Sequence, residues 1–162
     1  IEAWMPQRAS NDIYRATFAD ALVRARERWP GLRDIAFGDL FLQDIRAYRE
    51  ALCAELDWTP HFPIFDSTQG YTATLARRMI AAGLRAHLVC VDTEQLDGGF
   101  GGRDFDEALL HELPASCDPC GENGEFHTLV HAGPMFPAPI AVSKGETVLR
   151  DDRFAYTDFF RR

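Results

Sequence analysis

Apolar and polar positions follow two alternating patterns along the first half of the chain. Apolar residues recur at helical spacing in some segments and form short continuous runs in others, and Pro, Gly or Asp separates them. The spacing predicts helices over 11–29, 44–56 and 68–82, and strands or extended pieces over 34–37, 61–65 and 84–91. Helices and strands in alternation are typical of a parallel sheet with helices on its faces. We therefore expect an α/β domain over residues 1–92.

The pattern changes after Asp92. A glycine-rich segment at 98–102 precedes a predicted short helix at 104–113. From Glu125 onward only strand-like pieces remain, at 125–131, 139–143, 146–150 and 153–157. We place a domain boundary near residue 93 and expect 93–162 to form a mainly β region that shapes a substrate site.

The ends of the predicted strands are the first candidate site. Ligands of open α/β sheets bind outside the carboxyl ends of the strands. Small or acidic residues stand at three such ends, 38–39, 66–67 and 92–93, each before a predicted helix. Helix capping is the better interpretation of 66–67. Gly38 and Asp39 favour a ligand site, because no tightly capped turn follows them.

Charged residues gather at the start of the second predicted helix, around Asp44. Arg46 and Glu50 are four residues apart and so share one helical face. They fit either a surface ion pair or an arginine that a carboxylate holds at the strand ends.

The densest polar cluster of the chain lies at 121–128. Its two glycines permit tight turns and close approach to a ligand. If 125–131 is a strand, Glu125 and His127 point to the same side. A turn that leads into an edge strand explains the glycines, but it does not explain why Glu125 and His127 should point to the same side. We therefore interpret the cluster as functional.

Cys117 and Cys120 have the spacing of a metal or redox pair. A zinc site needs four ligands, and no second Cys-x-x-Cys occurs. A redox pair usually stands at a helix N-terminus, whereas glycine follows this one. His111, His127 and His131 keep a metal site open as a third hypothesis.

The segment 98–102 lacks the Gly-Lys-Ser/Thr ending of a phosphate loop and fits a mobile lid or a plain loop.

Composition narrows the classes of function. The chain has 162 residues, of which 46% are hydrophobic, and a formal charge of −8. This charge argues against nonspecific nucleic-acid binding, and no apolar run is long enough for a membrane span. Four cysteines without a visible leader favour reduced thiols, so we expect a cytoplasmic protein with neither nucleic acid nor membrane as partner.

Two segments together resemble a known family. They are AFGDLFLQDIRAYRE at 36–50 and DPCGENGEFHT at 118–128, the latter followed by GPMF at 133–136. They resemble the diphthine–ammonia ligase family and its bacterial relatives, which are N-type ATP pyrophosphatases of the adenine-nucleotide alpha-hydrolase superfamily. Asn123, Phe126 and His127 stand where the family's Glu-Gly-Gly-Glu-Tyr-Glu-Thr motif has Gly, Tyr and Glu.

The resemblance implies a Rossmann-like parallel sheet with flanking helices and a C-terminal, mainly β substrate region. It implies ATP with Mg²⁺, a carboxylate substrate (diphthine on an elongation factor, or a bacterial counterpart) and ammonia, with AMP, pyrophosphate and an amide as products. The site residues it implies are Gly38, Asp39 and Asp44 for nucleotide binding, Arg46, Glu122, Glu125 and His127 for catalysis, and Glu50, Asn123, Gly124 and Thr128 for substrate binding.

The family's phosphate loop, Ser-Gly-Gly-Lys-Asp-Ser, does not occur in these 162 residues. We expect it, with the first strand, to precede Ile1. We expect residues 1–162 alone to be inactive, and either to be unstable or to pair with another chain, such as a second copy in a homo-oligomer. The alternative is a non-catalytic module that binds a nucleotide or a partner without the loop.

Overall fold

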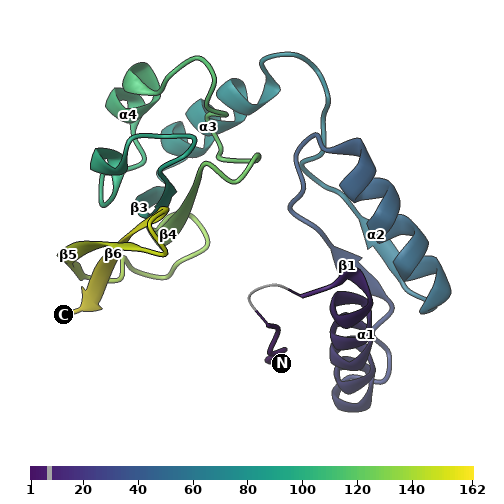
Figure 1. Ribbon diagram of the computed structural model, residues 1–162. Coiled ribbons are helices and arrows are strands. Elements are labelled where there is room, and N and C mark those ends of the chain that lie inside the picture. Colours follow the sequence, from purple (N-terminus) through teal and green to yellow (C-terminus); the bar gives the residue numbers. More distant parts are fainter. Residues whose placement is uncertain (7–8) are drawn as a thin grey trace. The chain divides into compact units, whose positions relative to one another are not determined.

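The structure is a computed structural model that describes residues 1–6 and 9–162 (Figure 1). It has two compact parts, the N-terminal unit (Ile1–Ser67) and the C-terminal unit (Thr68–Arg162). The elements in chain order are α1 (Asn11–Arg28), β1 (Asp34–Ala36), α2 (Gln43–Glu55), β2 (Thr59–His61), α3 (Tyr71–Ala81), β3 (Arg85–Asp92), a 3₁₀ turn (Gly98–Phe100), α4 (Glu107–Glu112), β4 (Phe126–Ala132), β5 (Val142–Arg150) and β6 (Phe154–Arg161). No helix in the described part of the chain combines the length and apolarity that crossing a membrane requires.

The N-terminal unit packs α1 and α2 on a short parallel sheet. Ile35 of β1 pairs with Pro60 of β2 in a parallel sheet, as expected, but β2 ends at His61, where the second predicted piece, 61–65, was expected to begin. Helix α1 begins after Ser10, whose Oγ accepts a hydrogen bond from the Ile13 N–H. The buried core of this unit comprises Leu22, Ala25, Phe37, Cys53 and Trp58. The first two predicted helices are confirmed to within one residue at each end.

The C-terminal unit is a four-stranded antiparallel sheet in the order β4-β3-β6-β5. Helices α3 and α4 pack on it through a core that includes Ala76, Leu88, Val91, Leu109, Phe126 and Ala155. The expected single parallel sheet over 1–92 is wrong at β3, which runs antiparallel to β4 and β6 and lies in a different sheet from β1 and β2. An apolar run shows that a strand is buried but does not encode the direction of its partners.

The division into units differs from the predicted boundary for the same reason. The two units meet at Ser67 and Thr68, whereas the sequence suggested the ranges 1–92 and 93–162. Strand β3 pairs with strands that follow it in the chain. Residues 93–162, which the sequence assigned to a substrate region, therefore contribute β4, β5 and β6 to the same sheet as β3, which the sequence assigned to the α/β domain.

Two bulges set which side chains of the central strands face the core. The pairing of Leu88 with Thr128 is followed by that of Cys90 with His127, so Val89 is an extra residue on β3. This shift lets Val91 rather than Cys90 continue the core-facing series. Near the start of β3 the register shifts again, and His131 becomes the extra residue on β4. Bulges of this kind re-aim side chains.

Several local predictions change in detail. Helix α3 starts after Gly70, so Asp66 and Ser67 do not cap it. The two pieces predicted at 139–143 and 146–150 are joined in the single strand β5, which begins only at Val142. The 98–102 segment is fixed rather than free, because the Gly102 N–H donates to the Leu88 carbonyl at 2.7 Å and Lys144 Nζ donates to the Gly101 carbonyl at 3.3 Å. These contacts favour the plain loop over the mobile lid.

Candidate functional site

Two of the three predicted strand ends lie together in the N-terminal unit. The Asp66 N–H donates to the Leu40 carbonyl at 2.8 Å, which joins the segment after β2 to the segment after β1. Gly38 is exposed in the segment after β1, and a side chain there would meet nothing within 4 Å. Packing therefore does not require glycine at this position. The third strand end, Asp92 and Thr93, belongs to the C-terminal unit.

Asp39 is held by an arginine that the sequence did not single out. Arg49 on α2 donates from Nε to Asp39 Oδ2 at 2.6 Å and from Nη1 to the Tyr14 hydroxyl at 3.0 Å. Its guanidinium also lies over the Phe37 ring, 4.6 Å from the centroid. Arg49 was visible in the charged cluster around Asp44, but its spacing from Asp39 follows no local rule. Tertiary packing alone brings the two together.

Arg46 is fixed by one carboxylate and two aromatic rings. Its Nε lies 2.8 Å from Glu50 Oε1, which confirms the predicted shared face of α2. Its guanidinium lies 4.9 Å from the ring centroid of Phe62 and 4.8 Å from that of Phe65. Arg46 is thus a positive charge with a defined position and partial exposure. Asp44 is exposed in the first turn of α2, where a carboxylate interacts favourably with the helix dipole.

In the C-terminal unit, a buried carboxylate organises the loop at residues 118–125. Only 1% of Glu125 is exposed. Its Oε1 accepts hydrogen bonds from the Asp118 N–H at 2.7 Å and from Asn123 Nδ2 at 3.1 Å. Its Oε2 accepts from the Asn123 N–H at 3.0 Å. Glu125 therefore cross-braces both ends of the loop, and its oxygens are engaged within the protein.

The loop also depends on its two glycines. Gly121 and Gly124 adopt left-handed backbone conformations, with φ of +72° and +85°. A side chain at Gly121 would lie 2.8 Å from the Phe126 carbonyl oxygen. Asp118 Oδ1 completes the turn by accepting from the N–H groups of Cys120 and Glu122. The tight turns that the sequence predicted are confirmed.

The loop presents a polar surface at its outer side. Asn123, Gly124, His127 and Thr128 are exposed, and Glu122 is partly exposed. Glu125 and His127 differ in environment, because β4 begins at Phe126 and Glu125 lies before the strand. Contrary to the prediction from the sequence, Glu125 and His127 therefore do not point to the same side. The exposed groups are those at the loop tip and at the start of β4.

A second buried carboxylate, Asp92, lies beside the loop. The Asp92 N–H donates to the Glu125 carbonyl at 2.9 Å. Its carboxylate accepts hydrogen bonds from Arg153 Nε at 2.8 Å and Nη2 at 2.6 Å, and a further bond from Gln95 Nε2 at 2.9 Å. The Arg153 guanidinium holds the pKa of Asp92 well below its usual range, and this more than offsets the opposite effect of burial. Sequence reasoning found Asp92 as a strand end but missed Arg153, which is 61 positions away.

The Cys-x-x-Cys motif begins one residue before the 118–125 loop and extends into it. All four cysteines are free thiols. Burial, with nearby Asp and Glu carboxylates, raises the pKa of Cys117 and of Cys120 to about 12 each. Cys120 Sγ donates to the Thr72 carbonyl, which ties the loop to α3. Across residues 1–6 and 9–162, no group of three or more His, Cys, Asp or Glu side chains is arranged to hold a metal ion.

These thiols should react slowly. With pKa values near 12, almost no thiolate exists at pH 8, and the thiolate is the nucleophile. We expect N-ethylmaleimide to label Cys117 and Cys120 at least about tenfold more slowly in the folded chain than in urea. Peptide mass spectrometry after timed labelling measures each site separately. Equal rates in the two states would contradict a buried, protonated pair.

Comparison with known proteins identifies the family. Residues 71–158, more than half of the chain, match the family model described as the diphthamide synthase C-terminal domain. A comparison with curated proteins found no match. The matched segment lies within the C-terminal unit and contains the whole of the 118–125 loop, with the exposed groups at its tip. The chain therefore belongs to the diphthamide synthase family.

Proposed function

We propose that the protein is an ATP-dependent amide-forming ligase of the diphthine–ammonia ligase type. A carboxylate oxygen of the substrate attacks the α-phosphorus of ATP, and pyrophosphate leaves. Ammonia then attacks the carbonyl carbon of the acyl-adenylate, AMP leaves, and the nitrogen loses a proton to give the amide. The observation that carries the proposal is the family match over residues 71–158, which include the braced loop.

The N-terminal unit supplies the groups suited to the nucleotide. Negative charge develops on phosphate oxygens during adenylation, and a fixed cation stabilises it. Arg46 has the required charge, and Glu50 with two phenylalanine rings limits its movement. The open backbone at Gly38 permits close approach of a ligand. The Asp39 carboxylate is paired with Arg49, so in this proposal Asp39 contributes to nucleotide binding indirectly, through this pair.

The C-terminal unit supplies the groups suited to the acceptor and ammonia. Glu122, Asn123, His127 and Thr128 present carboxylate, amide, imidazole and hydroxyl groups at or near the surface. In this proposal Glu122 and His127 bind or deprotonate the attacking nitrogen. Glu125 acts as a positioning residue, since its oxygens already accept three hydrogen bonds from the loop.

The proposal includes a carboxylate substrate, either diphthine on an elongation factor or a bacterial counterpart, in the cytoplasm. Mg²⁺ enters as the partner of the ATP phosphates, which usually supply several of its oxygen ligands. No cluster of metal-binding side chains in the described residues provides a separate site for it.

The test measures adenylation and amide formation separately. The complete gene product is incubated with ATP, Mg²⁺, ammonium and diphthine-bearing elongation factor, and AMP, pyrophosphate and the amide are quantified. We expect Glu122→Gln to lower amide formation at least about tenfold while carboxylate-dependent ATP–pyrophosphate exchange persists. Glu146→Gln, an exposed carboxylate on β5, is the matched control.

Absence of both ATP binding and pyrophosphate exchange in the complete gene product would refute the ligase proposal. Nucleotide or partner binding without turnover would instead favour the non-catalytic module. If the acceptor is not diphthine, ATP–pyrophosphate exchange should require a different carboxylate. A panel of carboxylates tested in the exchange assay identifies that substrate.

A further inference from the structure

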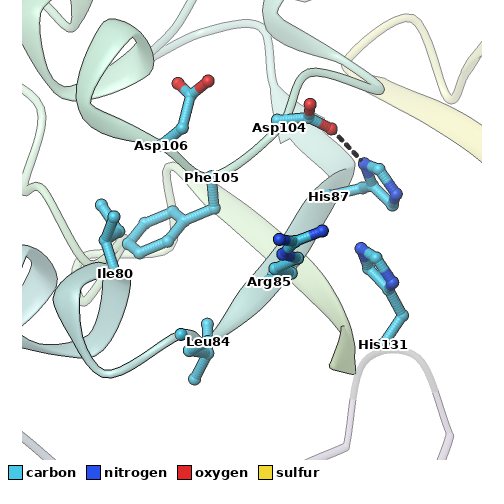
Figure 2. Close-up of a pocket in the computed structure, with 10 residues that line it drawn as sticks. Ile80, Leu84, Arg85, His87, Asp104, Phe105, Asp106 and His131 are labelled. Atoms are coloured by element: carbon cyan, nitrogen blue, oxygen red, sulfur yellow. Dashed lines mark ion pairs between the residues drawn. The ribbon is translucent and has the colours of Figure 1, made fainter. Parts of the chain in front are cut away.

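A pocket of about 390 Å³ lies in the C-terminal unit and shares no residue with the 118–125 loop. It forms where the end of α3, the start of β3 and the segment after the 98–102 loop meet (Figure 2). Its volume is within the range of sites for small organic ligands. The residues that matter for its chemistry are Ile80, Leu84, Arg85, His87, Phe105 and His131.

Three aromatic rings are stacked at one side of the pocket. The His87 ring on β3 lies between His131 of β4, with centroids 4.6 Å apart, and Phe159 of β6, with centroids 4.5 Å apart. The two imidazole planes differ by only 4°. His131 reaches this position because it is the extra residue of the β4 bulge. Two parallel rings cannot direct their nitrogen lone pairs at one ion, so the stack does not suit a metal.

The acidic groups of the pocket are already engaged. Asp104 Oδ1 lies 2.7 Å from His87 Nδ1, an ion-pair distance, although the angle is not that of a hydrogen bond. The segment of Asp104 is fixed beside β3, because the Phe105 N–H donates to the Ala86 carbonyl. Asp106 accepts from the Leu109 N–H at 2.8 Å as the cap of α4. Figure 2 shows the Asp106 carboxylate directed away from His87 and His131.

The basic groups, by contrast, have donors to spare. Within the described part of the chain, neither the Arg85 guanidinium nor the His131 ring makes a hydrogen bond or ion pair, and His87 Nε2 has no partner either. Arginine binds carboxylate and phosphate groups through two parallel N–H bonds. On the other side, Ile80, Leu84 and Phe105 supply an apolar wall.

We propose that this pocket binds a small organic anion. Its carboxylate or phosphate group is bound by Arg85 with the imidazoles of His131 and His87, and its apolar portion lies against Ile80, Leu84 and Phe105. The stack and the Asp104 contact fix the His87 ring in advance of binding, so less conformational entropy is lost. The site is independent of the proposed ligase activity and belongs to the same domain.

The test uses the 162-residue chain with phenyl phosphate and benzoate as probes, inorganic phosphate as the anion without an apolar part, and phenethylamine as the opposite charge. Titration calorimetry measures affinity, and NMR shift changes locate the site. We expect phenyl phosphate or benzoate to bind more tightly than inorganic phosphate, and phenethylamine not to bind. The shifts should concentrate at Arg85, His87 and His131.

Variants separate the charge from the fold. Arg85→Met should weaken binding of the aromatic anion at least about tenfold, as loss of a hydrogen-bonded charge predicts. His131→Phe keeps the ring stack but removes its N–H, and it should weaken binding less. Arg78→Met, an exposed arginine of α3 outside the pocket, is the matched control. Unchanged affinity in Arg85→Met, preference for phenethylamine, or equal affinity for inorganic phosphate would overturn the proposal.

Discussion

Glu125→Ala is expected to lower the free energy of unfolding of the C-terminal unit by about 3 kcal/mol. The substitution removes the acceptor of three hydrogen bonds, two of them from backbone N–H groups of the loop. An unsatisfied donor costs about 1–3 kcal/mol when buried, and less where water reaches it. Asn123 is exposed and regains water, whereas the Asp118 N–H is partly buried and regains less.

Hydrogen exchange is the appropriate measurement, because all three tryptophans lie in the N-terminal unit and their fluorescence does not report this loop. Amides of residues 116–127 should exchange faster in Glu125→Ala, and the urea midpoint by circular dichroism should fall. Glu146→Ala removes an exposed carboxylate of the same unit and should change neither quantity measurably. If the two variants behave alike, Glu125 does not brace the loop.

This prediction bears on the ligase proposal in a way that kinetics can detect. If Glu125 positions the loop, Glu125→Gln retains one acceptor oxygen and should lose less stability than the alanine variant. The loss of amide formation in Glu125→Gln should then parallel the increase in hydrogen exchange of the loop amides. A residue in contact with the substrate would instead lose activity in the glutamine variant without any change in hydrogen exchange.

Local sequence signals predicted most of the helices, because apolar spacing and turn residues act over a few positions. Helices α1 and α2 and the tight turns at Gly121 and Gly124 were found in this way. The pair of Arg46 and Glu50 was found for the same reason, since residues four apart share a helical face. The resemblance carried by residues 118–128 led to the family that residues 71–158 then matched.

Features that depend on long-range pairing were missed. The direction of β3 is set by β4 and β6, and the apolar run of β3 is the same for either direction. The partners of Asp39 and Asp92 are arginines 10 and 61 positions away, which no periodicity connects. The stack of His87 and His131 needs a bulge, and a bulge leaves no mark in the alternation of apolar residues.

The second large effect concerns pH and the pair of Asp92 and Arg153. The pair joins the end of β3 to the turn before β6, and Thr93 strengthens this link by donating from its N–H and its hydroxyl to the Arg153 carbonyl. The pKa of Asp92 is lowered in the folded chain from an ordinary value of 3.8, chiefly by the hydrogen bonds from Arg153. A lowered folded-state pKa stabilises the fold above the unfolded pKa, and this stabilisation is lost as the pH falls from about 4 toward the folded value.

Asp92→Asn should therefore cost about 2 kcal/mol at pH 7, since it replaces a charge-assisted pair with neutral hydrogen bonds while the half-exposed Arg153 regains water. The difference from the unmodified chain should shrink below about pH 4, because the unfolded chain then binds a proton at Asp92 that the folded chain does not bind, and this favours unfolding of the unmodified chain. Urea unfolding at pH 7, 5 and 3, followed by far-ultraviolet circular dichroism, measures both quantities. Glu94→Gln is the matched control, because Glu94 pairs with the same guanidinium at 3.0 Å but is 66% exposed, and its loss should cost less than about 0.5 kcal/mol at any pH. A deficit in Asp92→Asn that stays constant from pH 7 to pH 3 would show that shape rather than charge makes Asp92 important to the fold.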